Sequence, residues 1–187
     1  MSLKNRVILI LAFVLIGIAL LRYDLREPDQ PVLSLEVLDG EKADSYATDI
    51  TTDRFDQNGQ LASSVFSPRV DHFQSKGVSL LQMPDIRTWS QDGEWHTTAK
   101  NGRYYDADEH IELENNVVID RQPPQNPITM ATEWLRIDSH LEQASTDRPV
   151  VITAPDGIAE ATGMTADWAS NRVTLLSQVR ATYETAR

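Results

Sequence analysis

The hydrophobic residues of the chain follow two different patterns, which change near residue 31. Residues 7–21 form an unbroken apolar run of 15 residues, whereas much of the following chain alternates apolar and polar positions. As a helix, this run would span about 22 Å, which is short against the ~30 Å core of a bilayer. Arg6 and Arg22 can lengthen the span by reaching outward, and Tyr23 suits the membrane interface. The run therefore predicts a single N-terminal transmembrane helix.

A cleaved signal peptide and a buried core helix are the two other interpretations of this run. A signal peptide has an apolar segment of this length, but small residues precede its cleavage point. Residues 18–23 read IALLRY, with no Ala-x-Ala pattern, and the run has no polar stripe of the kind a core helix carries. We therefore expect an uncleaved anchor over residues 1–22, a Pro-containing linker over residues 23–31 and a body over residues 32–187.

Charge sets the expected orientation of this anchor. Lys4 and Arg6 precede the run, and a basic excess marks the cytoplasmic side of a membrane segment. The body then lies across the membrane, which in a bacterium means an inner-membrane protein with a periplasmic body. These two cations contribute +2 to the net charge of −11, which leaves −13 for residues 22–187. So acidic a body argues against binding to nucleic acid and against a surface that grips anionic lipid.

The body reads as a set of β-strands. Ile111 and Leu113 stand two residues apart, as do Val117 and Ile119. The clearest alternation lies near the C-terminus, where one predicted strand face carries Val173, Leu175, Val179, Ala181 and Tyr183. This period of two is typical of half-buried strands, and no segment after residue 31 sustains a helical period.

Turn signals separate these strands. The turn dipeptides are Asp39-Gly40, Asn58-Gly59, Asp92-Gly93, Asn101-Gly102 and Asp156-Gly157. A weak repeat also relates Val78-x-Leu80-x3-Pro84-x-Ile86 to Ile111-x-Leu113-x3-Val117-x-Ile119. Many short strands at such spacing predict an all-β body, which is a sandwich, jelly roll or barrel.

Candidate catalytic chemistry is sparse. The chain has no cysteine, which excludes disulfides, thiolate zinc sites and cysteine nucleophiles. The four histidines (His72, His96, His110 and His140) do not stand at metal-ligand spacing from one another. Residues 106–110 form an acidic cluster without the Gly and terminal Glu of a calcium loop, so the cluster predicts a hairpin tip. With no hydrolase or phosphate-binding motif either, we expect no enzyme, no metal and no cofactor.

The order of features resembles the LptC family, the membrane-anchored component of the lipopolysaccharide export system. A short N-terminal anchor precedes a β-rich body that carries Asn58-Gly59 early in its sequence. The tail carries Gly157-Ile158-x4-Gly163-Met164 and then Arg172-Val173-x-Leu175-Leu176-Ser177-x-Val179-Arg180-x2-Tyr183-Glu184. The resemblance covers essentially the whole chain.

This resemblance implies a twisted β jelly roll of antiparallel strands that is open along one side and has a lipid-binding interior. It also implies three kinds of partner: lipopolysaccharide, the inner-membrane ABC transporter formed by LptB, LptF and LptG, and the soluble periplasmic bridge protein LptA. The N-terminal end would dock onto the transporter, and the C-terminal end would pass lipopolysaccharide to LptA.

An apolar groove is the expected site for acyl chains, since each exposed CH₂ group costs about 0.8 kcal/mol in water. Alternate residues of a sheet would line it. The candidate lining residues are Ile50, Leu80, Leu81, Ile111, Leu113, Val117, Ile119, Val173, Leu175, Val179 and Tyr183. Leu80 and Leu81 are adjacent and cannot both face inward. The same residues could instead fill a closed core, because a groove and a core share one sequence pattern.

The last predicted strand, residues 172–184, is the preferred edge for the bridge protein, because an exposed edge can accept a partner's strand. Its candidate contact residues are Arg172, Thr174, Arg180 and Tyr183, and strands near residues 33–56 would face the transporter. Gly59, Gly157 and Gly163 are expected at positive φ or at close approaches, as ordinary turns or as docking positions. The alternative function is a structural tether that binds another envelope protein through these edges and carries no lipid.

Overall fold

A computed structural model describes residues 36–90, 93–121, 127–138, 141–167, 170 and 172–183. The chain divides into two units, Met1–Ser34 and Leu35–Arg187, and the first unit lies outside the described residues. The predicted anchor and linker therefore fall outside the described residues, as do His140 and Glu184. Within the described ranges, no helix has the length and hydropathy needed to cross a membrane.

Regular structure in the described residues consists of β-strands alone, as the alternating pattern predicts. Two short strands form a separate hairpin, and the others form one large sheet. The strands are β1 (Val37–Leu38), β2 (Glu41–Lys42), β3 (Ser45–Phe55), β4 (Leu61–Phe73), β5 (Val78–Gln82), β6 (Asp85–Ser90), β7 (Gly93–Thr98), β8 (Asn101–Tyr105), β9 (His110–Arg121), β10 (Ile128–Asp138), β11 (Gln143–Ala154), β12 (Gly157–Asp167) and β13 (Arg172–Tyr183).

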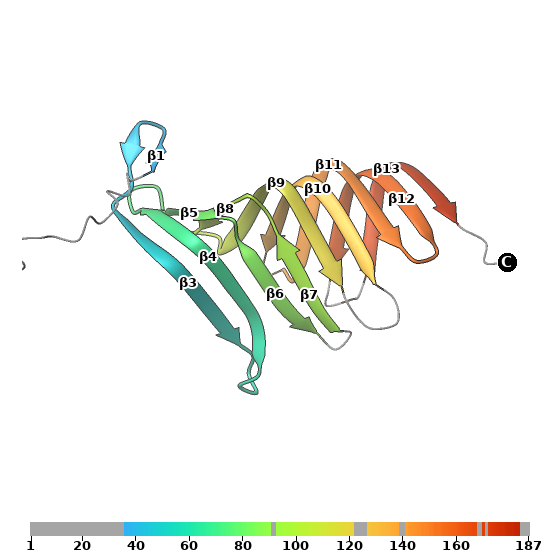
Figure 1. Ribbon diagram of the computed structural model, residues 1–187, viewed down its shortest axis with the longest axis horizontal. Coiled ribbons are helices and arrows are strands. Elements are labelled where there is room, and N and C mark those ends of the chain that lie inside the picture. The colour runs from blue at the N-terminus through green and yellow to red at the C-terminus, as the bar shows by residue number, and fades with distance from the viewer. Residues whose placement is uncertain are drawn as a thin grey trace, which may run out of the picture. The chain divides into compact units, whose positions relative to one another are not determined.

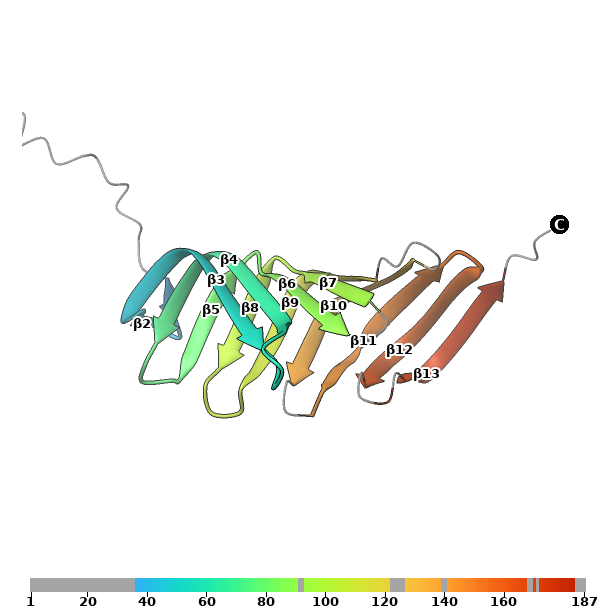
Figure 2. The same cartoon turned by 90° about the horizontal axis from the view of Figure 1, so that it is seen from below.

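The large sheet is an antiparallel meander that runs from β3 to β13 (Figures 1 and 2). β5 and β6 both pair with β4, and β7 and β8 both pair with β9, so each of these two pairs of strands replaces one long strand. The sheet does not close into a barrel. In the described part of the chain, β3 pairs only with β4 and β13 pairs only with β12.

A line of backbone irregularities crosses this sheet, and we call it the fold line. Positive φ angles mark it at Asp49, Met83, Asn115, Asn116, Gly163 and Gln178. Backbone hydrogen bonds join neighbouring points on the line: Met83 N donates to Lys100 O at 2.8 Å, and Lys100 N donates to Asn115 O at 3.0 Å. On β10 and β11 the line continues as register shifts between Thr132 and Arg136 and between Thr146 and Pro149.

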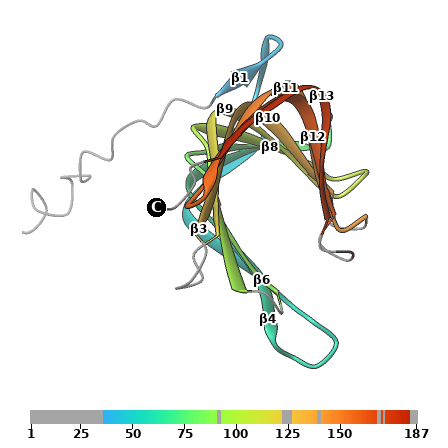
Figure 3. The same cartoon turned by 90° about the vertical axis from the view of Figure 1, so that its right-hand side faces the viewer.

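The fold line bends the sheet. An extra or left-handed residue in a strand kinks it and increases its twist, and aligned kinks add up across neighbouring strands. Gly163 adopts a φ of +80° without a Cβ penalty, and Asn115 and Asn116 belong to the residue type that tolerates this region best. Figure 3 shows the consequence, which is a sheet that curls around one side. We call this side the inner face.

The inner face carries the hydrophobic core. Leu113, Val117, Leu135 and Met164 are fully buried, and Val150 is 1% exposed. The same cluster includes Ile86, Ala99, Ile119, Met130, Ala144 and Ala161. Side chains on both sides of the fold line therefore share one core, because bending brings the two halves of each long strand over a common interior.

The hairpin of β1 and β2 is tied to the turn between β4 and β5. Ser75 Oγ donates to Glu41 Oε1 at 2.7 Å, and Lys76 Nζ lies 2.9 Å from Asp39 Oδ2. The backbone N–H of Gln74 donates to the carboxylate of Asp44 at 2.7 Å. These contacts fix the start of the described chain against one end of the large sheet.

Most turn predictions in the described residues are confirmed, but the one at Asn101-Gly102 is wrong. The structure places turns at Asp39-Gly40, at Asn58-Gly59 and just before Gly157. Asn101 and Gly102 instead begin β8. A Cβ on Gly102 would lie 3.2 Å from Pro84 Cγ and 3.4 Å from Leu113 Cδ2. Glycine is suited to this position because neighbouring side chains crowd it, and no change of chain direction is involved.

Candidate functional site

The candidate site is the inner face of the sheet together with its edge at β13. Residues directly opposite each other in paired strands have their side chains on the same face. Leu113 pairs with Gly102 on β8 and with Leu135 on β10, and Val117 pairs with Thr132. The register of the strands therefore puts all of these residues on the same face, which is the inner face.

Exposure along the inner face rises toward the β13 edge. Ile119 on β9 is 8% exposed, and Leu175 on β13 is partly buried against the core cluster. Val173, Val179 and Tyr183 are 44%, 51% and 75% exposed. These side chains share the inner face with Met164 and the alanines of β12, according to the register of β12 and β13. The apolar surface is thus packed at its centre and uncovered at its edge.

The structure brings most of the predicted lining residues together. Ile111, Leu113, Val117, Ile119 and Leu175 belong to the core cluster or pack against it. Val65 packs against this cluster and pairs with Thr52 on β3. Ile50 lies two residues from Thr52 and therefore shares its strand face. Leu81 is 7% exposed and shares a face with Gly102 and Leu113.

Leu80 is not brought together with the other lining residues. It pairs with Asp71 on β4 and with Arg103 on β8, on the face opposite to Leu81. That side of the sheet, which we call the outer face, has a hollow of about 210 Å³ there, lined by Glu36, Asp71, Leu80, Leu81, Gln82, Asn101, Gly102, Arg103 and Glu114. The expectation that Leu80 and Leu81 face opposite ways is confirmed.

A buried ion pair lies beside this hollow. Arg69 donates from Nε and Nη2 to the two carboxylate oxygens of Asp71, at 2.6 and 2.7 Å. Its guanidinium carbon lies 4.9 Å from the centre of the Tyr46 ring. The hydrogen bonds to Asp71 raise the pKa of Arg69. This bidentate pair is fully compensated, so we assign it to holding the N-terminal part of the sheet.

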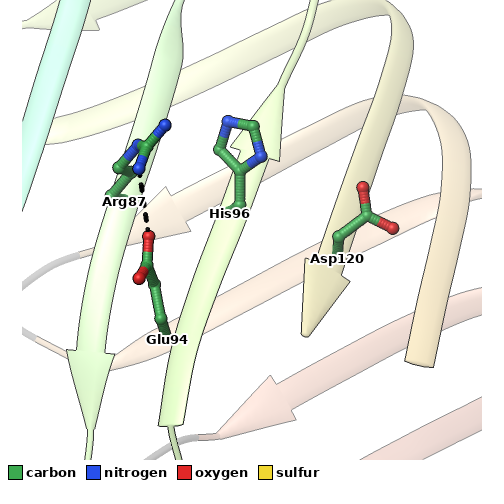
Figure 4. A pocket seen from close by; sticks show the side chains of 4 residues that line it. All are labelled: Arg87, Glu94, His96 and Asp120. Atoms are coloured by element: carbon green, nitrogen blue, oxygen red, sulfur yellow. Dashed lines mark hydrogen bonds and ion pairs between the residues drawn. The ribbon is translucent and has the colours of Figure 1, made fainter. Parts of the chain in front are cut away.

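A second hollow, of about 300 Å³, lies on the outer face and is polar (Figure 4). Arg87, Glu94, His96 and Asp120 line it from β6, β7 and β9. Arg87 Nη1 lies 3.3 Å from Glu94 Oε1, and His96 Nε2 lies 2.9 Å from Asp85 Oδ1. Arg87 and Glu94 thus pair opposite charges across two strands, as is typical of a solvated sheet surface. No group of three or more His, Asp or Glu residues in the described ranges could hold a metal ion.

Two tyrosines on β8 remain neutral at ordinary pH. Burial raises the pKa of Tyr104, and the nearby carboxylates of Glu109 and Asp106 raise it further. Burial also raises the pKa of Tyr105, whose hydroxyl donates to Glu112 at 3.2 Å. Tyr104 pairs with Ile111 and so presents an uncharged ring to the inner face.

The predicted contact residues of the edge lie where the sequence pattern placed them. Arg172 and Thr174 pair with Asp167 and Thr165, and Arg180 pairs with Glu160, all on the outer face of β13. Tyr183 lies on the inner face opposite Gly157. All four side chains are exposed. Their contact with a partner stays a prediction.

The three predicted glycines have the expected geometry. Gly59 and Gly163 have φ angles of +77° and +80°. At Gly157 a Cβ would collide with the backbone carbonyl oxygen of Thr182 on β13. Their role in docking stays a prediction, whereas their conformational role is confirmed.

Sequence reasoning missed several central residues of this site. Met130, Leu135 and Met164 are buried in the core cluster, and Trp95 packs against it. The signal was present on β10, where alternation through residues 128, 130 and 132 changes phase to residues 135 and 137. That change of phase is the register shift at the fold line.

The described residues define a class of all-β protein: an open antiparallel sheet whose inner face holds a shared apolar core. A solved structure with this fold is LptH from Pseudomonas aeruginosa, described as the LptA-homologous periplasmic component of the conserved lipopolysaccharide transport device. The match has a TM-score of 0.54 and 7% sequence identity, and it covers 66% of this chain and 95% of that one. At this identity, the likeness shows the fold alone.

The chain belongs to the LptC-related lipopolysaccharide-assembly family, whose family model matches residues 8–184. The resemblance seen in the sequence is therefore confirmed. No curated protein sequence gives a significant match. The predicted all-β, antiparallel body is confirmed as well, and the predicted transmembrane helix lies outside the described residues.

Proposed function

We propose that this protein accepts lipopolysaccharide from the ABC transporter of LptB, LptF and LptG and passes it to the bridge protein LptA. One observation carries the proposal: the largely apolar inner face extends from a buried core to an uncovered edge at β13. Membership of the lipopolysaccharide-assembly family supports it.

Acyl chains have a physical reason to bind this face. Each CH₂ group removed from water contributes about 0.8 kcal/mol, so even a few groups on Val173, Val179 and Tyr183 favour contact. These side chains are exposed apolar groups in the free protein. Covering them with lipid removes apolar surface of both partners from water.

The packed centre of the inner face favours a second candidate function. Leu113, Leu135 and Met164 are fully buried, which leaves no space beside them for an acyl chain in this conformation. A tether that binds envelope proteins through its edges would need only such a closed core. The lipid proposal therefore requires either that chains travel along the exposed margin or that the two halves of the sheet separate at the fold line.

The two unpaired edges are the proposed contact surfaces for proteins. In the described residues, β3 and β13 each leave one side without a strand partner. A strand of another protein can add to such an edge through main-chain hydrogen bonds. We assign β13 to LptA and β3 to the transporter, so the sheet would connect the two partners.

We also propose that residues 7–21 anchor the protein in the inner membrane, with the N-terminus in the cytoplasm. The unbroken apolar run and the basic residues before it support this assignment. Removal of residues 1–22 should release the protein from membranes that alkaline carbonate has stripped of peripheral proteins. Persistence of the shortened chain in the membrane fraction would contradict the anchor.

The transport proposal is tested by a matched pair of substitutions on β13. Val179→Arg places a charge on the exposed inner face, and Thr182→Arg places the same side chain on the outer face. In vesicles that contain the transporter, Val179→Arg should reduce ATP-driven transfer of lipopolysaccharide to LptA several-fold, and Thr182→Arg should not. Equal transfer by both variants would favour the tether. Leu113 is unsuitable for this test, because a charge at a fully buried position would unfold the body.

A further inference from the structure

An arginine lies on the inner face of the described strands β6 to β13. Among the paired inner-face positions of the described strands β6 to β13, Arg121 is the only charged residue, and carboxylates are absent from these positions. Arg121 lies at the end of β9, two residues after the buried Ile119. Residues two apart on a strand point to the same side, so its side chain belongs to the inner face.

Apolar partners on both neighbouring strands confirm this placement. Arg121 pairs with Trp95 on β7 and with Ile128 on β10, and both of these pack against the core cluster. The guanidinium carbon of Arg121 lies 5.3 Å from the centre of the Trp95 ring. Stacking on an aromatic ring holds the cation in place but leaves its N–H donors available.

One hydrogen-bond donor of Arg121 is unused within the described residues. Its Nε is buried and has no hydrogen-bond partner there. A buried donor that is left unpaired destabilises a fold, and more so when the group is charged. The other arginines with described ion pairs, such as Arg69, Arg87 and Arg103, face carboxylates on the outer face. Among the ion pairs of the described residues, none involves Arg121, which leaves room for an anion from outside the chain.

We propose that Arg121 binds a phosphate group of an amphiphile whose acyl chains lie on the apolar inner face. A guanidinium matches two phosphate oxygens at once, and a charge-assisted pair of this kind is among the strongest hydrogen bonds in proteins. The proposal rests on the proposed lipid-carrying function and adds a recognition element to it. It also offers a way for a body with a net charge of −13 over residues 22–187 to hold a phosphorylated lipid, since Arg121 lies on the face opposite to the carboxylates that pair with Arg87 and Arg103.

The position of Arg121 also determines which way the bound lipid would point. Trp95, Arg121 and Ile128 lie where β7 and β10 begin and β9 ends, at the rim of the inner face, whereas Leu113 on β9 and Leu135 on β10 lie deeper in the sheet. A phosphate at the rim leaves the acyl chains to extend over the apolar surface. Headgroup and chains would then occupy separate parts of one face.

Binding of matched lipids to the full chain in non-ionic detergent tests this proposal. The probes are diphosphorylated lipid A, the same lipid after removal of both phosphates, and inorganic phosphate alone. We expect the unmodified protein to bind the phosphorylated lipid about tenfold more tightly than the dephosphorylated one. Arg121→Gln should bind the two lipids equally, and Arg121→Lys should retain part of the preference, because it keeps the charge without the planar fork.

A control and three outcomes make the result decisive. Arg136→Gln removes a cation from the outer face, where Arg136 lies 3.7 Å from Asp138, and should leave the preference unchanged. An undiminished preference in Arg121→Gln would overturn the assignment of Arg121 while leaving lipid binding intact. Failure of the unmodified protein to bind either lipid would instead refute the proposed function. Competition by millimolar inorganic phosphate alone, without any effect of the acyl chains, would identify a free-anion site and overturn the amphiphile proposal.

Discussion

Single glycines decide how closely the last two strands approach. At Gly157 a Cβ would collide with the carbonyl oxygen of Thr182, whereas at Gly59 it would meet nothing within 4 Å. Gly157→Ala should therefore lower the free energy of unfolding by about 1–3 kcal/mol and increase amide exchange along β13. In Gly59→Ala the new side chain meets no neighbour, and only the φ of +77° is unfavourable for alanine. This substitution should lower the free energy of unfolding by about 1 kcal/mol. Equal losses in chemical denaturation would contradict the close approach.

The Arg69–Asp71 pair provides a second prediction for single residues. Asp71 is fully buried, and both of its oxygens accept hydrogen bonds from Arg69. Asp71→Ala leaves the guanidinium without its partner, so it should lower the urea midpoint more than the double substitution Arg69→Met with Asp71→Leu does. The two midpoints can be compared in one experiment. A less stable double variant would show that the pair itself is a net source of stability.

At the scale of elements, the strands could be predicted but their bends could not. Alternation at Ile111, Leu113, Val117 and Ile119 predicted β9, because a half-buried strand has a period of two. Kinks depend on how neighbouring strands align, which a single strand pattern does not contain. One trace was visible: in both copies of the weak repeat, the three-residue gap holds a positive φ angle, at Met83 in one and at Asn115 and Asn116 in the other. The gap in each copy of the repeat therefore marks the point where the fold line crosses that part of the chain.

For the candidate site, the sequence predicted which residues share a strand face but not how exposed each of them is. Leu113 and Val179 have the same alternating pattern, yet one is fully buried and the other is 51% exposed. Position in the sheet makes this difference, since β9 has neighbours on both sides and β13 has one in the described residues. Arg121 was missed because an arginine at the end of a strand is usually solvated. Its pairing with Trp95 and Ile128 shows that it lies on the inner face.

Burial at the centre of β10 predicts a large effect of a single truncation. Leu135→Ala removes a fully buried side chain from the shared core and should cost about 2–5 kcal/mol of unfolding free energy. Leu141→Ala is the matched control, because Leu141 lies in a turn and is 66% exposed. Its effect should stay within about 0.5 kcal/mol. Similar losses for both variants in urea titrations would argue against one core that spans the fold line.

The edge at β13 permits a test with introduced cysteines, because the natural chain has none. A cysteine at Thr174 on the edge strand should form a disulfide with a cysteine in the edge strand of LptA that pairs with it. A cysteine at Thr153 should not, because Thr153 lies on β11, between β10 and β12. Disulfide formation is read by non-reducing electrophoresis. Equal yields at both positions would mean that LptA does not bind by adding a strand to β13.

On the scale of the body, folding of one sheet produces both the core and the edge. The fold line brings the halves of each long strand together, which buries Leu113, Val117, Leu135 and Met164 in one cluster. The same fold leaves the sheet open, so apolar inner-face residues reach solvent on β13. A closed barrel would have no such margin. Because the sheet is open, its inner face has a buried centre and a solvent-accessible edge at β13.

The central claim, that lipid travels on the inner face, is tested most directly by two neighbouring residues of β13. Ala181 pairs with Ala159 on the inner face, and Thr182 pairs with Ile158 on the outer face. A photo-crosslinking amino acid is placed at each position in the full chain, together with the transporter and lipopolysaccharide in vesicles. Capture of lipopolysaccharide at position 181 and not at position 182, dependent on ATP, is the predicted result. Capture at position 182 alone, or equally at both positions, would contradict the account.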